Sequence, residues 1–377
     1  MYSFDFYIRK TSKTVDLIKE CEKVHYSAKH LDVKEYDNAV VLPSGNWTNE
    51  GKLKGGIIDK SGNYIANSGY TDGGGEGYWV DDRMITTCDS IAIYVGFIYS
   101  CWGHLITDSL AKLWYLNTIE CKSLIESGAT LIYLTQFNTD LPQYCIDFLR
   151  FADIDVNNFR HIKQVVRFKK IIVPDNSLFK DKRSLFYTQE FKDVIELIKS
   201  NVVIDETSPT KIYYTRTAIN DERERGRERD VEKLFRRQGY RIVSPEKQTV
   251  KRQLQLLLRC EKLVAAEGSV SHNALFLNKG AEVVVLRKVD HVNVYTPLIG
   301  QLAEIKTIYI DANHSTMAYR KIPTAGPFYV CVTKHLRNYL GIGGVWRPFL
   351  LHYSYWKYFF TVPMKWGGKK LLCKLKR

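Results

Sequence analysis

The chain has 377 residues, enough for two ordinary domains, and its 45% hydrophobic and 25% charged residues with only 10 prolines exclude a largely disordered protein. Its eight cysteines form no CxxC pair and no compact cluster with histidine, so the sequence signals neither a zinc site nor a disulfide framework and predicts reduced thiols in a cytosolic protein. Lys and Arg exceed Asp and Glu by 14, which favours anionic partners: phosphorylated substrates, anionic lipid or nucleic acid.

The first residues, MYSFDFYIRK, carry Asp5 early and are followed by no apolar run, so we expect neither a signal peptide nor a membrane anchor. The longest uncharged apolar run, 91–103, is shorter than the roughly 20 residues that a spanning helix needs. Residues 38–79 alternate short β-like pieces with turn formers, and their glycine-rich end lacks the GK[ST] of a Walker loop. An irregular, loop-rich opening is predicted.

From about residue 90 the pattern alternates strand and helix. The predicted strands are 90–100, 129–135 and 169–175, and the predicted helices are 103–120, 141–154 and 188–200. Beyond a hinge at Ser208-Pro209-Thr210, predicted strands 211–216, 240–245, 262–268 and 281–288 alternate with helices 221–238, 248–260 and 269–277. The second series predicts a parallel α/β domain of the Rossmann type. We expect domains over 1–207 and 208–326, followed by an aromatic and basic segment, 327–377.

The charged run DERERGRERD (221–230) has nearly balanced charges at the front of a predicted helix, so we interpret it as a solvated face of ion pairs. No nucleic-acid-binding motif occurs elsewhere in the chain. Nucleic acid is therefore the least favoured of the anionic partners.

A candidate for proton transfer lies at the start of the helix predicted over 103–120. His104 and Asp108 are four residues apart, so the imidazole and the carboxylate share one helix face. A carboxylate partner holds the tautomer of a histidine and raises its basicity, which suits general-base catalysis near neutral pH. In the alternative, His104 caps the helix and Asp108 pairs with a nearby base.

A candidate anion site lies in VAAEGSVSHNALF (264–276), where a predicted strand turns into a helix. Backbone amides at a helix N-terminus, with small hydroxyl residues and a glycine that permits close approach, predict a site for a diphosphate. The residues concerned are Glu267, Gly268, Ser269, Ser271, His272 and Asn273. An ordinary capped turn is the alternative.

Arg216 ends KIYYTR at the carboxyl edge of the second domain's first strand, the edge at which doubly wound sheets bind ligands. Its guanidinium could neutralise a leaving diphosphate by paired, charge-assisted hydrogen bonds. The alternative is a surface ion pair with an acid of the run 221–230.

Taken in order, CWGHLITDSLAKLWYL (101–116), IYYTR (212–216) and the segment 238–286 resemble glycosyltransferase family 61. The resemblance implies a GT-B-like α/β architecture, with two Rossmann-type domains facing a central cleft and a nucleotide-sugar donor held mainly by the second. It also implies inversion at the anomeric carbon, with no required metal and no cofactor. In it, Arg216 and the turn 267–273 match the donor diphosphate site, and His104 with Asp108 matches the first-domain motif.

One departure concerns this turn. Many family members read HGAGLTN where this chain reads EGSVSHN (267–273), so Glu267 replaces a histidine and His272 a threonine. It stays open whether Glu267 binds a sugar hydroxyl or acts as the base in place of His104 or Asp108.

We therefore expect an inverting, metal-independent glycosyltransferase that moves a sugar to a glycan or lipid-linked acceptor in bacterial surface polysaccharide synthesis. The alternative function is a non-catalytic carbohydrate- or nucleotide-binding protein on the same fold. Aromatic and basic residues from Tyr353 onward predict docking of a cytoplasmic enzyme on the anionic inner membrane face. In the alternative, these aromatics complete the first domain's core.

Overall fold

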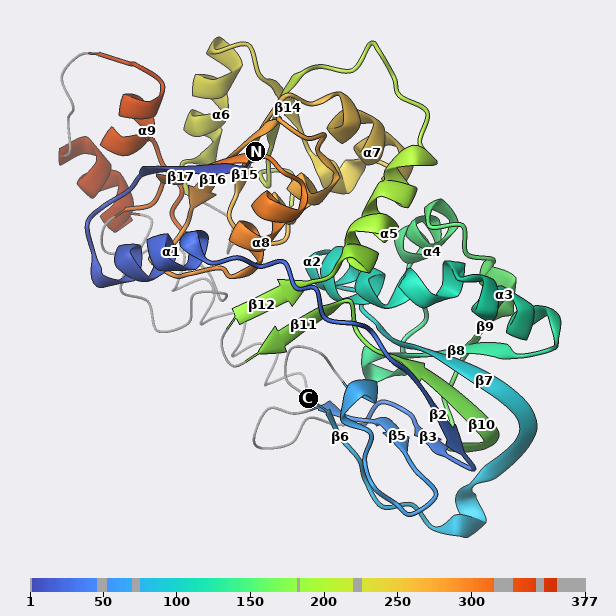
Figure 1. Cartoon of the computed structure of the whole chain (residues 1–377). Coiled ribbons are helices and arrows are strands. Elements are labelled where there is room, and N and C mark those ends of the chain that lie inside the picture. Colours follow the sequence, from blue (N-terminus) through green and yellow to red (C-terminus); the bar gives the residue numbers. More distant parts are fainter. Residues whose placement is uncertain are drawn as a thin grey trace, which may run out of the picture. The chain divides into compact units, whose positions relative to one another are not determined.

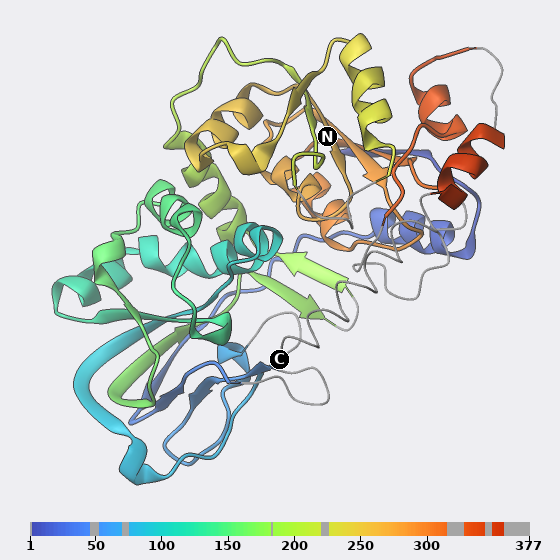
Figure 2. The same ribbon diagram turned by 180° about the vertical axis from the view of Figure 1, so that it is seen from behind.

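The computed structural model describes residues 2–45, 53–69, 75–181, 184–219, 226–314, 328–343 and 349–357, and Figures 1 and 2 show it from opposite sides. The chain forms two compact units. We call Met1–Val24 with Ile204–Arg377 the terminal unit, and His25–Val203 the central unit. The first 24 residues, which we expected in the N-terminal domain, thus belong with the C-terminal part of the chain.

The terminal unit is built on a six-stranded sheet in which every strand runs parallel to its neighbours. In spatial order the strands are β1 (Ser3–Tyr7), β17 (Lys306–Asp311), β16 (Glu282–Arg287), β15 (Lys262–Ala266), β13 (Lys211–Tyr214) and β14 (Arg241–Val243). The inner strands are almost continuous apolar runs, as burial on both faces requires. The parallel α/β pattern predicted beyond residue 211 is confirmed.

Helices cover this sheet (Figures 1 and 2). They are α1 (Ser12–Glu22), α6 (Glu228–Arg237), α7 (Val250–Arg259), α8 (Tyr295–Leu302) and α9 (Lys334–Tyr339), with the short 3-10 helices η8 (Pro245–Lys247) and η9 (Ser271–Phe276). Phe235 of α6 and Leu336 of α9 pack in one buried cluster with Val264 and Ile308. Because β1 pairs with β17 and α1 contacts α8, the start of the chain completes this unit.

Residues 349–357 form a further helix in the terminal unit. Its Tyr355 is buried, with the ring stacked on His314 at 4.0 Å and edge-on to Tyr329. The described part of 327–377 belongs to the terminal unit, and the ring of Tyr355 packs there, so this ring does not follow the alternative of completing the first domain's core. Residues 358–377 lie outside the described residues.

The central unit contains a mixed seven-stranded sheet. Its path is β5 (Gly56–Ile58), β3 (Val40–Leu42), β10 (Val166–Pro174), β7 (Thr86–Ile98), β8 (Thr130–Thr135) and β9 (Phe159–His161), with β2 (Val33–Asp37) also paired to β10. The strands β10, β7, β8 and β9 are parallel, whereas β2 and β3 run antiparallel to β10. Part of the opening that we expected to be irregular thus supplies antiparallel strands.

Other elements of the central unit surround this sheet. They are α3 (Ile119–Glu126), α4 (Gln143–Phe151), α5 (Gln189–Ser200), the hairpin β11 (Leu178–Asp181) and β12 (Ser184–Tyr187), the pair β4 (Leu53–Lys54) and β6 (Gly75–Glu76), and the turns η1 (Ala66–Ser68), η2 (Asp82–Met84), η5 (Gln136–Asn138) and η6 (Val156–Asn158).

The helix predicted over 103–120 is not regular. It consists of α2 (Trp102–His104), the π-helix η3 (Leu105–Ser109) and the 3-10 helix η4 (Leu110–Asn117). The Ser109 hydroxyl accepts a hydrogen bond from the N–H of Tyr99 over 3.0 Å, and such side-chain bonds to the backbone compete with a regular helix.

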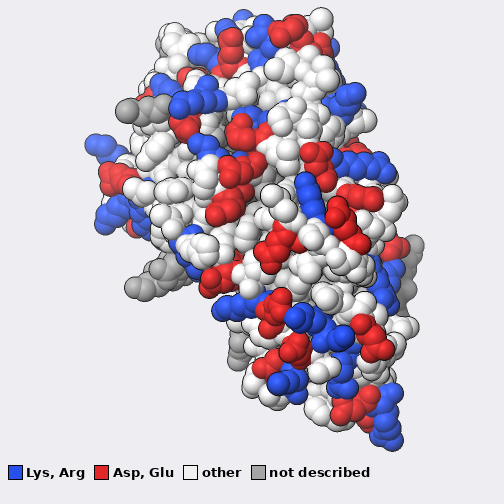
Figure 3. Space-filling model, turned by 45° about the vertical axis from the view of Figure 1, so that its right-hand side comes forward, with Lys and Arg blue, Asp and Glu red and all other residues white. Residues whose placement is uncertain are grey.

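The surface in Figure 3 carries basic and acidic side chains interspersed. Part of the positive excess lies near the end of the sequence, since residues 358–377 contain six Lys or Arg and no acid. Within the described ranges, every helix is too short or too polar to cross a lipid bilayer.

Candidate functional site

The loop that carries His104 leaves the carboxyl end of β7. The strands β8 and β9 lie on one side of β7, whereas β10, which follows them in the chain, lies on the other. In doubly wound sheets, the loops at such a reversal of strand order form the ligand crevice. The first predicted site thus lies where this kind of sheet binds ligands.

His104 and Asp108 are in contact. The Nδ1 atom of His104 lies 3.0 Å from Oδ2 of Asp108, and the Thr107 hydroxyl donates to the same oxygen over 2.7 Å. The Asp108 side chain is only 2% exposed and that of His104 is 29% exposed. Because a carboxylate only accepts, the Nδ1–H group is the donor and the neutral imidazole carries its lone pair on Nε2. The pair therefore has the tautomer that a proton acceptor requires.

Lys112 fixes the same helical segment to the sheet. Its stem crosses β7 at Gly96, where φ is +98° and a Cβ atom would overlap Cδ of Lys112. Its amine donates to the carbonyl of Asn67 over 3.0 Å, and burial lowers its pKa to about 8. Gly96 is thus needed both for the backbone conformation and for the room that Lys112 occupies.

Arg216 and Glu267 lie at the same level of neighbouring strands in the terminal unit. Tyr214 pairs with Ala265 in the register of β13 and β15, so the residues two positions further on fall side by side beyond the strand ends. Since β14 lies on one side of β13 and β15 on the other, this is again a reversal of strand order. The structure brings Arg216 and the turn 267–273 to one sheet edge.

The loop of Arg216 is fixed through its backbone. The N–H of Arg216 donates to Oε1 of Glu228 over 3.2 Å, and the Tyr213 hydroxyl donates to the same oxygen over 3.1 Å. Glu228 is buried in the first turn of α6. The run 221–230 thus meets Arg216 through this carboxylate, while residues 221–225 lie outside the described part.

The turn after β15 is closed by its own side chains. Gly268 has φ +118°, a conformation that glycine favours. The Ser271 hydroxyl donates to the Gly268 carbonyl over 2.8 Å, and the Asn273 amide donates to that of Val270 over 3.0 Å. The chain then enters the 3-10 helix η9 and not the predicted α-helix. Ser271 and Asn273 hold the turn, and Ser269 is half-buried beside Gly268.

His272 links this turn to α8. Its ring lies 5.3 Å from that of Tyr295, and its Nε2 atom is 3.4 Å from Nδ2 of Asn293. The side chain is buried. His272 thus contributes to the shape of the edge as well as to its polarity.

Glu267 is 6% exposed at the end of β15. Burial raises its pKa to about 7, although nearby Arg287 acts to lower it. Its Oε1 atom has no hydrogen-bond partner among the described residues. A carboxyl group that titrates near neutral pH can accept or donate a proton in catalysis.

Sequence reasoning missed an ion-pair cluster beside Glu267. Arg287, fully buried, donates to Oδ1 of Asp311 over 2.8 Å and to Oδ1 of Asp290 over 2.9 Å. The N–H of Arg9 donates to the other oxygen of Asp311 over 2.8 Å. The available signal was a charged residue ending an apolar strand, as Arg287 and Asp311 do. This cluster ties the start of the chain to the sheet edge.

The side chains that could bind a metal ion and the cysteines were considered in the described ranges. In the described ranges, no three His, Cys, Asp or Glu side chains are grouped so that they could hold a metal ion. The cysteines of these ranges form no disulfide with one another, and most are buried.

A comparison with protein-family models matched one segment of the chain that contains the loops of both sheet edges. Residues 102–284 match the family model described as Glycosyltransferase 61. Just under half of the chain is thus similar to glycosyltransferase family 61. The protein is therefore a glycosyltransferase enzyme. A search of curated proteins found no match.

The matched segment begins just before His104 and ends within β16. It spans the loops after β7, β13 and β15, and so contains every residue that the sequence predicted for the site in both units. Arg287 and Asp311 lie beyond it. The matched segment thus covers both candidate edges but not the whole ion-pair cluster.

Proposed function

We propose that this glycosyltransferase is an inverting, metal-independent enzyme that transfers a sugar from a nucleoside-diphosphate sugar to a glycan or lipid-linked acceptor in bacterial surface polysaccharide synthesis. The observation that carries the proposal is that one family match joins two reversals of strand order, one bearing His104 and the other Arg216 and Glu267. The loops at such reversals bind ligands in doubly wound sheets.

The donor is assigned to the terminal unit. In a direct displacement, negative charge grows on the departing nucleoside diphosphate, and positive charge placed beforehand stabilises it. Arg216 supplies a guanidinium suited to paired hydrogen bonds with phosphate oxygens. Gly268 has no side chain, so a diphosphate can approach the backbone of Ser269 closely. The buried Ser271, His272 and Asn273 maintain the turn.

Acceptor activation is assigned to His104. The acceptor hydroxyl donates a hydrogen bond to Nε2, and its proton passes to the imidazole as its oxygen attacks the anomeric carbon. The Asp108 carboxylate stabilises the resulting imidazolium. Attack opposite the leaving diphosphate inverts the configuration of that carbon. A positioned base of this kind contributes about 10²–10⁴-fold in rate.

Glu267 is the second candidate for the base. Its pKa of about 7 suits proton transfer, but the carboxyl group is buried close to Arg287. His104 is favoured because its ring is partly exposed and its tautomer is fixed by Asp108. In this assignment Glu267 accepts a hydrogen bond from a hydroxyl of the donor sugar.

The two units suit a GT-B architecture, in which Rossmann-type domains face a central cleft. We propose that the carboxyl edges bearing His104 and Arg216 line that cleft. No cofactor is assigned, since the nucleotide sugar is itself a substrate. Independence from metal rests on the resemblance to family 61.

Peripheral binding to the inner membrane face is supported by the helix 349–357. Four of its side chains are exposed and apolar or aromatic: Phe349, Leu350, Tyr353 and Trp356. Residues at spacings of three and four share one helix face. Aromatic surface next to basic sequence is typical of interfacial helices, and a lipid-linked acceptor would be presented there to a cytoplasmic enzyme.

The test is a thermal-shift screen against nucleotide sugars, followed by NMR of the product formed from the stabilising donor. The proposal predicts a product of opposite anomeric configuration, formed equally well in EDTA. Retention of configuration would contradict direct displacement, and loss of activity in EDTA would contradict independence from metal.

A further inference from the structure

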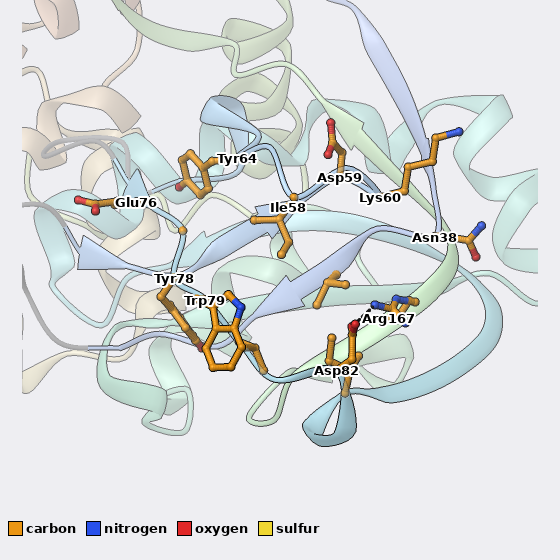
Figure 4. Close-up of a pocket in the computed structure, with 15 residues that line it drawn as sticks. Asn38, Ile58, Asp59, Lys60, Tyr64, Glu76, Tyr78, Trp79, Asp82 and Arg167 are labelled. Atoms are coloured by element: carbon orange, nitrogen blue, oxygen red, sulfur yellow. Dashed lines mark hydrogen bonds and ion pairs between the residues drawn. The ribbon is translucent and has the colours of Figure 1, made fainter.

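A groove on the central unit belongs to neither edge described above (Figure 4). It encloses about 790 Å³, within the range of about 300–1,000 Å³ found for ligand pockets. Asp82 and Ile85 line it just before β7 begins, whereas His104 follows the other end of that strand. The groove is therefore separate from the proposed site of proton transfer.

Three aromatic side chains line the groove. Figure 4 shows Tyr64 on one side and Tyr78 with Trp79 on the other. The Trp79 side chain is 85% exposed. A single exposed apolar residue needs no explanation, but aromatic surface gathered around a concavity marks a binding site.

The two tyrosine rings are held in place without a ligand. The Tyr64 hydroxyl donates to the carbonyl of Gly55 over 3.1 Å, and that of Tyr78 donates to Pro43 over 3.0 Å. Gly69 and Gly75 leave the room that Tyr64 fills, since a Cβ atom on either would overlap its hydroxyl. Because these rings are already ordered, binding does not have to order them.

Polar side chains also line the groove, several of them away from the aromatic rings (Figure 4). They are Asn38, Asp59, Lys60, Glu76, Asp82 and Arg167. Asp82 and Arg167 form an ion pair at 2.9 Å. The backbone N–H groups of Ser61 and Asn63 both donate hydrogen bonds to Oδ1 of Asp59. Glu76, Lys60 and Asn38 are thus the groups that we assign to a ligand. Three acids face two bases here, so the groove does not favour a polyanion.

We propose that this groove binds an uncharged stretch of a glycan chain. A pyranose ring has a face of C–H groups that stacks on an aromatic ring, and an edge of hydroxyls that bond to carboxylates and amides. The groove offers both kinds of partner. When a growing acceptor glycan occupies the groove, the groove contacts sugars that are distant from the reacting end of the glycan. Long acceptors therefore bind better than short ones. The inference uses the glycosyltransferase assignment only in choosing saccharides as ligands.

The test is calorimetry and saturation-transfer NMR with cellohexaose, maltohexaose and chitohexaose. We expect at least one of them to bind the wild-type chain. Trp79→Ala should weaken that binding about tenfold or more, which is about 1.4 kcal/mol, and Trp79→Phe should retain most of it. Ile119→Ala is the matched control, because Ile119 is 89% exposed on α3 of the same unit and outside the groove.

Binding of none of the three saccharides would overturn the proposal, as would equal binding by wild type and Trp79→Ala. The thermal shift with nucleotide sugars is measured for the same variants. Trp79→Ala should leave that shift unchanged, so failure of the groove and failure of the donor site are distinguished.

Discussion

The buried carboxylate of Asp108 accepts a hydrogen bond from Nδ1 of His104 over 3.0 Å, and the two residues occupy a π-helix and the turn before it. Single π-helical turns inside helices are rare and often occur at functional sites. The proposed mechanism gives this geometry a role, since the buried acid sets the tautomer and the partly exposed imidazole takes the proton.

Substituting His104→Ala or Asp108→Asn should lower turnover about 10²–10⁴-fold while leaving donor affinity nearly unchanged, because the pair is assigned to the acceptor. Steady-state kinetics and donor calorimetry separate the two effects. Asp147→Asn is the control: Asp147 forms an exposed i,i+4 pair with Gln143 on α4. Wild-type turnover in both site variants, with loss of turnover in Glu267→Gln, would move the base to Glu267.

Removal of the Arg216 guanidinium should weaken binding of the nucleotide sugar. Hydrogen bonds to charged groups contribute about 1.5–3 kcal/mol, so Arg216→Ala should raise the Kd about 10- to 100-fold with little change in melting temperature. Calorimetry with the donor measures this. Arg236→Ala, at an exposed position in the last turn of α6, should bind as wild type. Unchanged affinity in Arg216→Ala would remove that residue from the donor site.

The pKa of Glu267 predicts a pH dependence of stability. The folded pKa, about 7, is raised above the ordinary value of 4.5, so the folded state keeps a proton that the unfolded state releases as the pH rises between these values. Stability is lost over this window, by up to about 3 kcal/mol. Glu267→Gln should remove this loss of stability. Arg287 remains paired with Asp311 and Asp290 in that variant.

Thermal unfolding from pH 4 to pH 9 checks this. The Gln variant should gain stability over wild type above pH 7 but not near pH 4, whereas the exposed control Glu246→Gln should follow wild type. Parallel curves for wild type and Glu267→Gln would show that the carboxyl group titrates normally.

The Gly96 and Lys112 contact predicts a coupled pair of substitutions. Gly96→Ala should cost about 1–3 kcal/mol in backbone strain and about 1–3 kcal/mol more from overlap with Lys112. Gly128→Ala is the control, since Gly128 has φ +96° with open space around a Cβ atom, and only the strain is expected there. Calorimetric unfolding of Gly96→Ala with Lys112→Ala should show that the overlap cost is relieved; strictly additive losses would refute the contact.

Membrane docking is tested by sedimentation with vesicles. Each basic group near an anionic leaflet contributes about 1 kcal/mol, so the whole chain should bind phosphatidylglycerol vesicles and release them in salt. A chain ending at Pro363, or Tyr353→Ser with Trp356→Ser, should bind less. Val15→Ser, on exposed α1 surface, should have no effect. Binding indifferent to lipid charge would contradict docking.

Strand and helix alternation could be predicted because the parallel strands are long apolar runs. The pairing of distant segments, such as β1 with β17, could not be predicted. A short strand such as Ser3–Tyr7 does not specify its partner strand. The contact of His104 with Asp108 followed from helical spacing. The contacts of Asp311 with Arg287 and with Arg9 did not, since these three residues follow or end three separate strands and become neighbours only in the folded sheet.

Release of nucleoside diphosphate from a panel of nucleotide sugars tests the central claim most directly. We expect the wild-type chain to release it from at least one donor, faster when an acceptor glycan is added. Stabilisation by a nucleotide sugar without release, with or without acceptor glycan, would contradict the claim and favour a binding protein on this fold.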